Sequence, residues 1–180
     1  ISIQNPDDLE KLQDVISQEC MSRNLMDQMK SVLSEKIRTV LVEYPYVDKD
    51  YRSTFYAFYS KRHRSYDQFC HRIHFFDSDP VIENLENSQD SYMGSMVLRP
   101  TEITPLGRTL IAPEAIRNFA GFVCEAEFRN NIMGLPFPVQ TFPHTMQDTD
   151  VTVCAHAVCW MIARYYSEKY TVYPETLTYD

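Results

Sequence analysis

The chain has 180 residues, of which 44% are hydrophobic and 23% are charged, and only four are glycine. This composition predicts a globular protein of one domain or one and a half domains, and it excludes a disordered or low-complexity chain. The formal net charge of -8 argues against a nucleic-acid partner and against binding to an anionic membrane, because both need clustered Lys and Arg.

The cysteine pattern predicts reduced thiols and a cytoplasmic location. Five cysteines are an odd number, irregularly spaced, in a chain large enough to fold without disulfides. No apolar stretch approaches the roughly 20 residues of a membrane helix, and the first residues do not form a signal peptide. Because the chain starts at Ile1 and stops at Asp180 without a terminating pattern, we expect a piece of a longer protein.

Two helices are predicted first. The segment Asn5-Pro6-Asp7-Asp8 combines a capping side chain, a proline suited to the first helical position and two carboxylates that complement the helix dipole. A second helix is predicted to begin near Ser22 or Asn24. Apolar residues at helical spacing follow both starts, and we expect them in the core: Leu9, Leu12, Val15 and Ile16 in the first helix, and Leu25, Met29, Val32 and Leu33 in the second.

The middle of the chain is predicted to be mainly antiparallel sheet. Strands are expected at 37–43, where Pro45 closes the run, and then at 69–76, 92–98, 108–112 and 119–128. Between the first two strands, the aromatic residues of 51–59 fit a helical face as well as alternation, and we favour a helix. The prolines Pro136, Pro138 and Pro143 predict irregular backbone and the best domain boundary, dividing a mixed module at 1–135 from a second unit at 136–180.

The chemistry is predicted at the start of the last helix, 153–168. With Thr152 as the capping residue, Cys154 falls at the second helical position, where unpaired amides and the positive end of the dipole favour thiolate over thiol. The same amides are able to stabilise an oxyanion formed by attack on a carbonyl. Because this helix is apolar nearly all round, we expect it to be buried.

The residues from Gln147 through Cys154-Ala155-His156 resemble the papain-like cysteine peptidases, and they look closest to bacterial relatives of the leader-peptide-cleaving, bacteriocin-processing group. The resemblance covers about residues 136–170. It implies an α+β, papain-like fold that is incomplete in this chain, with Cys154 as nucleophile and Gln147 in the oxyanion hole. It implies a peptide or protein substrate and no cofactor or metal. Gln147 lies one position further from the cysteine than is common in the family, and Ala155 stands where glycine is common.

The catalytic histidine is then expected beyond Asp180. His156 lies two positions after Cys154 and so points to another side of the helix, and the earlier histidines are in the reverse of the family order. Cys159, followed by Trp160, is a competing nucleophile, although it sits further inside the helix, where we expect its side chain to face packing. The alternative function is a non-catalytic protein-binding or scaffold domain with a degenerate site. An unrelated α+β fold is the third possibility.

Three other polar groups remain open. Cys70, His71, His74 and Asp77 have metal-binding chemistry, but alternation sends His71 to the face opposite Cys70 and His74. The charged residues from Asp48 to Arg52 are expected to cap a helix rather than to perform acid and base catalysis. Three arginines on or next to predicted strands are able to pair with Asp48 or Asp50 or to hold a substrate carboxylate: Arg72, Arg99 and Arg108.

Overall fold

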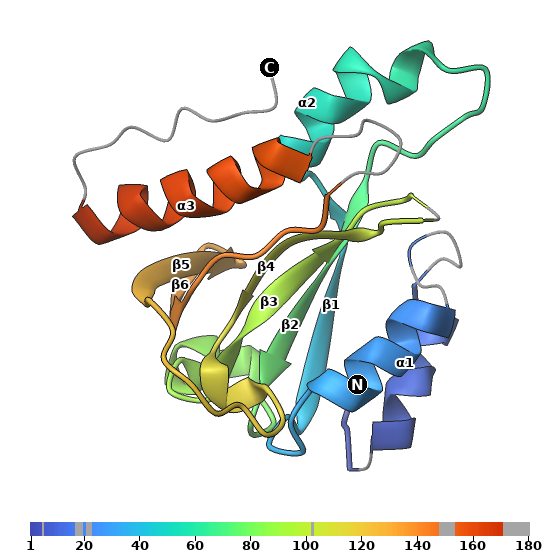
Figure 1. Ribbon diagram of the computed structural model, residues 1–180. Helices are drawn as coiled ribbons and strands as arrows, with labels where there is room; N and C mark the ends of the chain where they lie inside the picture. Colours follow the sequence, from blue (N-terminus) through green and yellow to red (C-terminus); the bar gives the residue numbers. More distant parts are fainter. Residues whose placement is uncertain (5, 17–19, 21–22, 102, 148–153, 171–180) are drawn as a thin grey trace.

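The protein is an α+β structure built on a four-stranded antiparallel sheet in the order β1-β2-β3-β4, with a separate two-stranded antiparallel sheet, β5-β6. A computed structural model describes the chain apart from residues 5, 17–19, 21–22, 102, 148–153 and 171–180, and at Pro6, Arg23, Ile82 and Cys154 it describes the backbone alone. The amino-terminal helices cover one face of the larger sheet, while the β5-β6 hairpin and α3 lie on the other side (Figure 1). The predicted α+β class with an antiparallel sheet is confirmed.

The first face of the sheet is closed by the 3-10 helix η1 (Pro6–Asp14) and by α1 (Arg23–Val32). Most of the apolar residues predicted for these helices are buried there, against Ile73 and Phe75 of the sheet. The prediction is wrong for Val15 and Val32, which are 54% and 49% exposed. Val15 follows the end of η1 and Val32 is the last residue of α1, whereas their neighbours Ile16 and Leu33 are buried.

The larger sheet contains β1 (Thr39–Tyr46), β2 (Cys70–Phe76), β3 (Tyr92–Leu98) and β4 (Leu106–Ile111). The strands predicted at 69–76 and 92–98 are confirmed. Pro45 does not close the first strand as predicted, because β1 continues through it to Tyr46. The register of β1 against β2 shifts between Glu43 and Tyr46, and an irregular edge strand tolerates a residue that lacks a backbone N–H.

The ambiguous aromatic segment is helical, as predicted: α2 (Lys49–Ala57) is followed by the 3-10 helix η2 (Tyr59–Lys61). Asp48 caps α2, because its side chain accepts a hydrogen bond from the amide of Tyr51 at 2.9 Å. Tyr51 and Tyr59 are buried with Cys70 and Val97 of the sheet. Two further 3-10 helices are η3 (Ile82–Ser88) and η4 (Pro113–Ala115).

Strand β5 (Ala126–Ile132) and strand β6 (Leu135–Thr141) form a hairpin. The strand predicted at 119–128 therefore begins only at Ala126, because the exposed segment before it has no ladder partner among the described residues. The hairpin turns at Met133 and Gly134, whose φ angles are 51° and 86°. Positive φ at both central residues is the requirement of a tight two-residue turn that matches the strand twist.

The proline-rich segment is a strand, so the prediction of irregular backbone there is wrong. Ile132 pairs with Leu135 across the two-residue turn, Asn131 with Pro136, and Arg129 with Pro138. Antiparallel pairs alternate between hydrogen-bonded and non-hydrogen-bonded, and the pair flanking such a turn is hydrogen-bonded. Both prolines consequently occupy positions whose nitrogen faces away from β5, and the ladder needs no N–H from them. The predicted boundary between 135 and 136 falls inside β6.

Helix α3 (Cys154–Tyr170) packs its buried residues Ala157, Trp160 and Tyr165 toward the protein, and Tyr165 joins the core of the hairpin. The expectation of a helix buried all round is wrong, because Val158, Ile162, Tyr166 and Tyr170 are 50%, 46%, 45% and 49% exposed. The described elements cover only one side of this apolar helix. Within the described part of the chain, no helix combines the length and the apolar character needed to cross a membrane.

Candidate functional site

The chain reaches the predicted nucleophile along the edge of β4. His144 and Thr109 exchange two backbone hydrogen bonds of 2.7 and 2.9 Å, and the amide of Met146 donates to the carbonyl of Leu106 at 3.2 Å. Gln147, the predicted oxyanion residue, follows directly and is exposed. The backbone leading to Gln147 is therefore fixed to the sheet while its side chain stays accessible.

Arg99 strengthens this attachment. Its guanidinium donates to the carbonyl oxygens of Thr104 at 2.8 Å, Leu106 at 3.0 Å and Met146 at 3.3 Å, and the residue is buried. The sequence left Arg99 as a partner of Asp48 or Asp50, or as a carboxylate-binding residue. It is instead a structural clamp that joins the turn between β3 and β4 to the segment before Gln147.

The first described residue of helix α3 is Cys154, and the helix continues to Tyr170. The first amides of a helix have no acceptor inside the helix, so the predicted start at Val153 would place the Cys154 amide among unpaired donors. The side chain of Cys154, the predicted cap Thr152 and the rest of the connection from Gln147 lie outside the described residues.

The competing nucleophile Cys159 sits within α3, one turn beyond the first, where its amide belongs to the helical hydrogen-bond ladder. Its side chain is exposed, which corrects the expectation that it faces packing. His156 is also exposed on this helix. Cys124 is exposed, whereas Cys20 and Cys70 are buried, and burial raises the pKa of the Cys70 thiol, an effect to which the nearby Asp48 adds.

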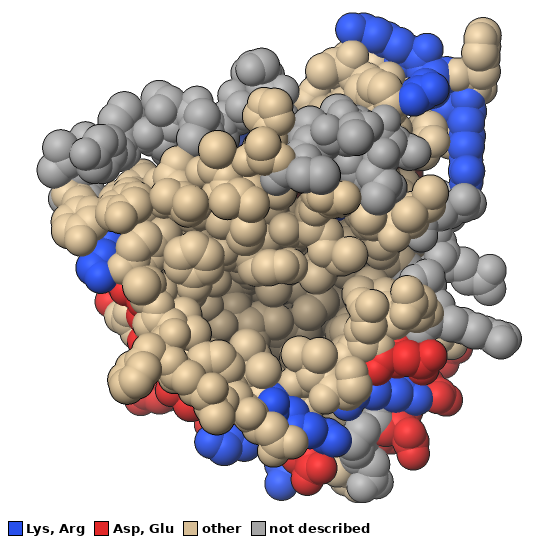
Figure 2. Space-filling view, viewed as in Figure 1, with Lys and Arg blue, Asp and Glu red and all other residues tan. Residues whose placement is uncertain are grey.

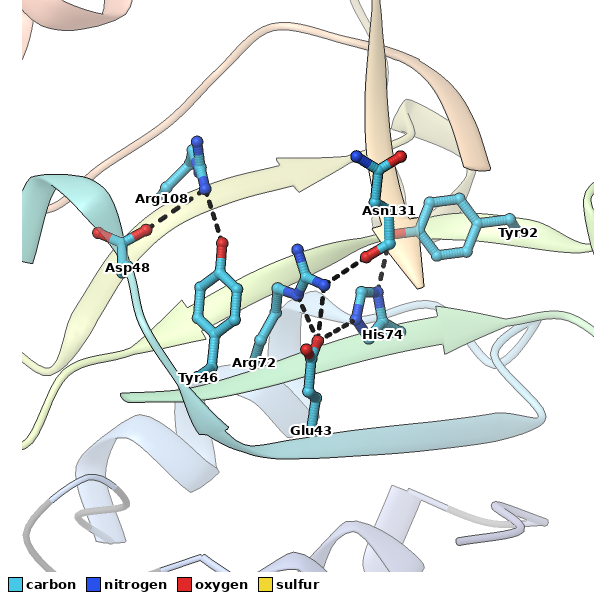
Figure 3. Close-up of polar contacts among 8 residues, drawn as sticks. All are labelled: Glu43, Tyr46, Asp48, Arg72, His74, Tyr92, Arg108 and Asn131. Atoms are coloured by element: carbon cyan, nitrogen blue, oxygen red, sulfur yellow. Dashed lines mark hydrogen bonds and ion pairs between the residues drawn. The ribbon is translucent and has the colours of Figure 1, made fainter. Parts of the chain in front are cut away.

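A buried polar network lies on the sheet face that carries the hairpin (Figure 3). Alternate residues of β2 point to this face, with Cys70 in the apolar cluster under α2 and Phe76 in the apolar cluster under the hairpin. Between them, Arg72 donates to the carboxylate of Glu43 through Nε at 2.7 Å and through its terminal nitrogen at 2.6 Å. His74 is fully buried between two partners: Nδ1 is 3.0 Å from the hydroxyl of Tyr92, and Nε2 is 3.4 Å from Glu43.

The electrostatics of this network favour a charged Glu43 and a neutral His74. Partial burial opposes ionisation of Glu43, but the hydrogen bond with His74 and the charge of Arg72 outweigh it and lower the pKa of the carboxyl group. Burial lowers the pKa of His74, and the positive charge of Arg72 acts in the same direction. Burial also raises the pKa of Tyr92. The result is a carboxylate, a neutral imidazole and a phenol in one hydrogen-bonded chain.

The network holds the two sheets together. Arg72 also donates to the backbone carbonyl of Asn131 in β5 and stacks over the ring of Tyr46, 4.3 Å from its centroid. His74 has no exposed surface, and Tyr92 is 7% exposed, so a substrate has no access to the imidazole or to the phenol. We therefore assign these residues to the structural attachment of the hairpin and not to catalysis.

The neutral, buried state of His74 predicts that stability falls with acid. Its pKa is lower in the folded chain than the ordinary value of 6.5, so below about pH 6.5 the unfolded chain binds a proton that the folded chain does not, and stability is lost as the pH falls. Urea denaturation between pH 7.5 and pH 5.5 is expected to show this slope, to which one histidine contributes at most about 1.4 kcal/mol per pH unit. His74→Gln should flatten the slope without abolishing it, because burial also lowers the pKa of His71. Equal slopes for the two proteins would contradict the assignment.

A second ionic group joins α2 to β4. Arg108 lies 3.4 Å from the carboxylate of Asp48 and donates to the hydroxyl of Tyr46 at 2.9 Å. Asp48 is 2% exposed. Burial and the charge of Asp48 raise the pKa of the neighbouring Asp50, against the opposing charges of Arg108 and Arg164. Of the partners that the sequence left open for Arg108, the structure gives Asp48. The expected capping of a helix by this charged segment is confirmed for Asp48.

The residues with metal-binding chemistry lie on opposite faces of the sheet. His71 stacks on Tyr44 with ring centroids 4.3 Å apart, whereas His74 contacts Tyr92 on the other face. Among the described residues, no group of three or more His, Cys, Asp and Glu is arranged to hold a metal ion. Sequence reasoning missed Glu43 and Tyr92 as partners of His74. Two polar side chains on the same face of a buried strand were the available signal, since buried polar groups need partners.

The reactive site predicted at Gln147 and Cys154 stays a prediction. Comparison with protein-family models, with curated proteins and with solved structures found no match to this chain.

Proposed function

We propose that the chain is the front part of a papain-like cysteine peptidase or related amide hydrolase, in which Cys154 attacks a peptide or isopeptide carbonyl and Gln147 helps to bind the oxyanion. The proposal is supported by Cys154 being the first described residue of α3, because the predicted helix start at Val153 would place this cysteine in the first turn, which favours a thiolate. The attachment of the preceding segment to β4 supports the role of Gln147, because an oxyanion donor must be held in place.

The proposed reaction has two steps. The Cys154 sulfur forms a bond to the carbonyl carbon, the carbon–nitrogen bond breaks, and the amine leaves with a proton from a general acid, giving a thioester. Water then attacks the thioester, yielding a carboxylic acid and restoring the thiol. In the family that this sequence resembles, a histidine donates and accepts these protons, and that residue is proposed to lie beyond Asp180.

Labelling with iodoacetamide tests the nucleophile. At pH 6.5, Cys154 is expected to react about ten times faster than Cys124 and Cys159, because reactivity follows the thiolate fraction and not exposure alone. The comparison is informative because both reference thiols are exposed, whereas Cys20 and Cys70 are buried. Mass spectrometry of the digested protein gives the rate at each cysteine.

Two variants sharpen the comparison. Cys159→Ala should leave the fast reaction in place, and Cys154→Ala should remove it while the midpoint of thermal unfolding stays unchanged. If Cys154→Ala destabilises the fold and all exposed thiols react at one slow rate, the cysteine is structural and the proposal fails.

A second candidate function is non-catalytic protein binding. It is favoured by the exposed residues Val158, Ile162 and Tyr166, which follow one another at four-residue spacing on α3. Figure 2 shows that the visible surface over this helix is largely uncharged. Neighbours at this spacing lie on one side of a helix, as in helices that dock an apolar face against a partner. Slow, equal labelling of the cysteines would favour this second function over the first.

A further inference from the structure

A hollow lies between the end of η1 and the beginning of β2, on the sheet face opposite the network of Glu43 and Arg72. Its volume is about 500 Å³, and the residues that matter for its chemistry are Asp14, Tyr44, Asp67, Phe69 and His71. This volume lies within the range of small-molecule and side-chain binding sites. We call it the Asp67 pocket. No Lys or Arg is among the described residues that line it.

The carboxylate of Asp67 is held in place before any ligand arrives. One oxygen accepts a hydrogen bond from the amide of Phe69 at 3.1 Å, and the other accepts one from the hydroxyl of Tyr44 at 3.3 Å. The backbone carbonyl of Asp67 accepts a third from the hydroxyl of the buried Tyr51 at 2.8 Å. A carboxylate fixed in this way binds a cation without first losing much side-chain entropy.

An aromatic pair forms another wall of the pocket. The ring of Tyr44 stacks on that of His71 with an interplanar angle of 19°, and Tyr44 is 53% exposed. Tyr44 thus offers an aromatic surface beside a carboxylate, which is the combination that attracts a planar cation. Burial lowers the pKa of His71, so the imidazole is neutral near pH 7 and does not repel such a cation.

His71 lies behind the ring of Tyr44 and is 5% exposed. Its Nδ1 has no hydrogen-bond partner among the described residues, but this atom is buried and is not open to a ligand. The exposed part of this wall is therefore the ring of Tyr44.

A second hollow of about 590 Å³ shares Asp67 with the first and is also lined by Phe55 and Tyr66. Because the two hollows share Asp67, the space next to this residue suits a side chain carried on a peptide better than an isolated ion. The net charge of -8 adds a general attraction for cations.

We propose that the Asp67 pocket binds the side chain of an arginine in a peptide, with the guanidinium paired to Asp67 and stacked on Tyr44. This binding does not depend on Cys154 being a nucleophile. The proposal is tested on the full chain carrying Cys154→Ala, so that turnover cannot alter the result. The probe is acetyl-arginine-amide, compared with acetyl-citrulline-amide, which has the same shape without the charge.

Titration followed by amide NMR shifts is expected to show saturable shifts around residues 44, 67 and 71 with the arginine probe, and binding about ten times weaker with citrulline. Asp67→Asn should weaken arginine binding about fivefold, and Tyr44→Leu about threefold. Asp90→Asn removes a carboxylate that does not line the pocket and should change nothing. Circular dichroism confirms that each variant is folded. Equal binding of the two probes, shifts located elsewhere, or no saturable shifts at all would each overturn the proposal.

Discussion

Replacing Arg108 with Met is expected to lower the free energy of unfolding by about 3 kcal/mol, because it leaves the carboxylate of Asp48 buried without its cation. Asp48 is 2% exposed and forms an ion pair with Arg108, whose side chain is 16% exposed. The substitution also removes the hydrogen bond from Arg108 to Tyr46. Urea denaturation at pH 7 measures the change.

Two further variants separate the ionic term from lost packing. Asp48→Asn keeps a side chain able to cap α2, so the double variant Asp48→Asn with Arg108→Met should be more stable than Arg108→Met alone. The surface pair of Arg129 and Glu127, at 70% and 43% side-chain exposure, provides the matched control: Arg129→Met should cost less than about 1 kcal/mol. Equal losses of unfolding free energy for Arg108→Met and Arg129→Met would show that the pair of Asp48 and Arg108 contributes no more than a surface pair.

Gly94→Ala is expected to destabilise the sheet by about 4 kcal/mol, the sum of backbone strain and overpacking. Gly94 lies within β3 with φ at 123°, and a Cβ atom added there would lie 2.1 Å from the carbonyl oxygen of Leu110. The backbone of β4 would have to move away, and β4 is the strand that anchors the segment before Gln147. Thermal and urea unfolding give the loss.

Gly134→Ala is the matched control for this substitution. Gly134 also has a positive φ, of 86°, but nothing lies within 4 Å of an added Cβ atom. Its cost should be confined to the left-handed backbone, about 1 kcal/mol. If the two alanine variants are destabilised equally, the close approach of β3 to β4 at Gly94 is not tight.

The sequence predicted best where local pattern and tertiary environment agree. Strand β3 has its predicted bounds because both of its faces are buried, and Asp48 caps α2 because capping is decided within a few residues. The sequence-based prediction failed at Pro136 and Pro138. A proline in a strand removes a hydrogen bond of the ladder only when its nitrogen faces the paired strand. That direction is fixed by the turn at Met133 and Gly134 and by the register with β5.

The apolar composition of α3 predicted burial, but composition does not specify how many neighbours a helix has. Only Ala157, Trp160 and Tyr165 are buried by the described elements. The candidate site shows the same difference between features set by local sequence and features set by tertiary contacts. Cys154 is helical as expected, but the predicted cap Thr152 and the predicted start at Val153 lie outside the described residues. The pairing of His74 with Tyr92 and Glu43 was not readable, because it depends on which strands become neighbours in the sheet.

The outward nitrogens of Pro136 and Pro138 have a consequence for association. The outer edge of β6 lacks two of the N–H donors that an added strand would need, and edges interrupted in this way resist edge-to-edge joining of sheets into aggregates. A partner that recognises this protein by extending one of its sheets is therefore directed away from β6.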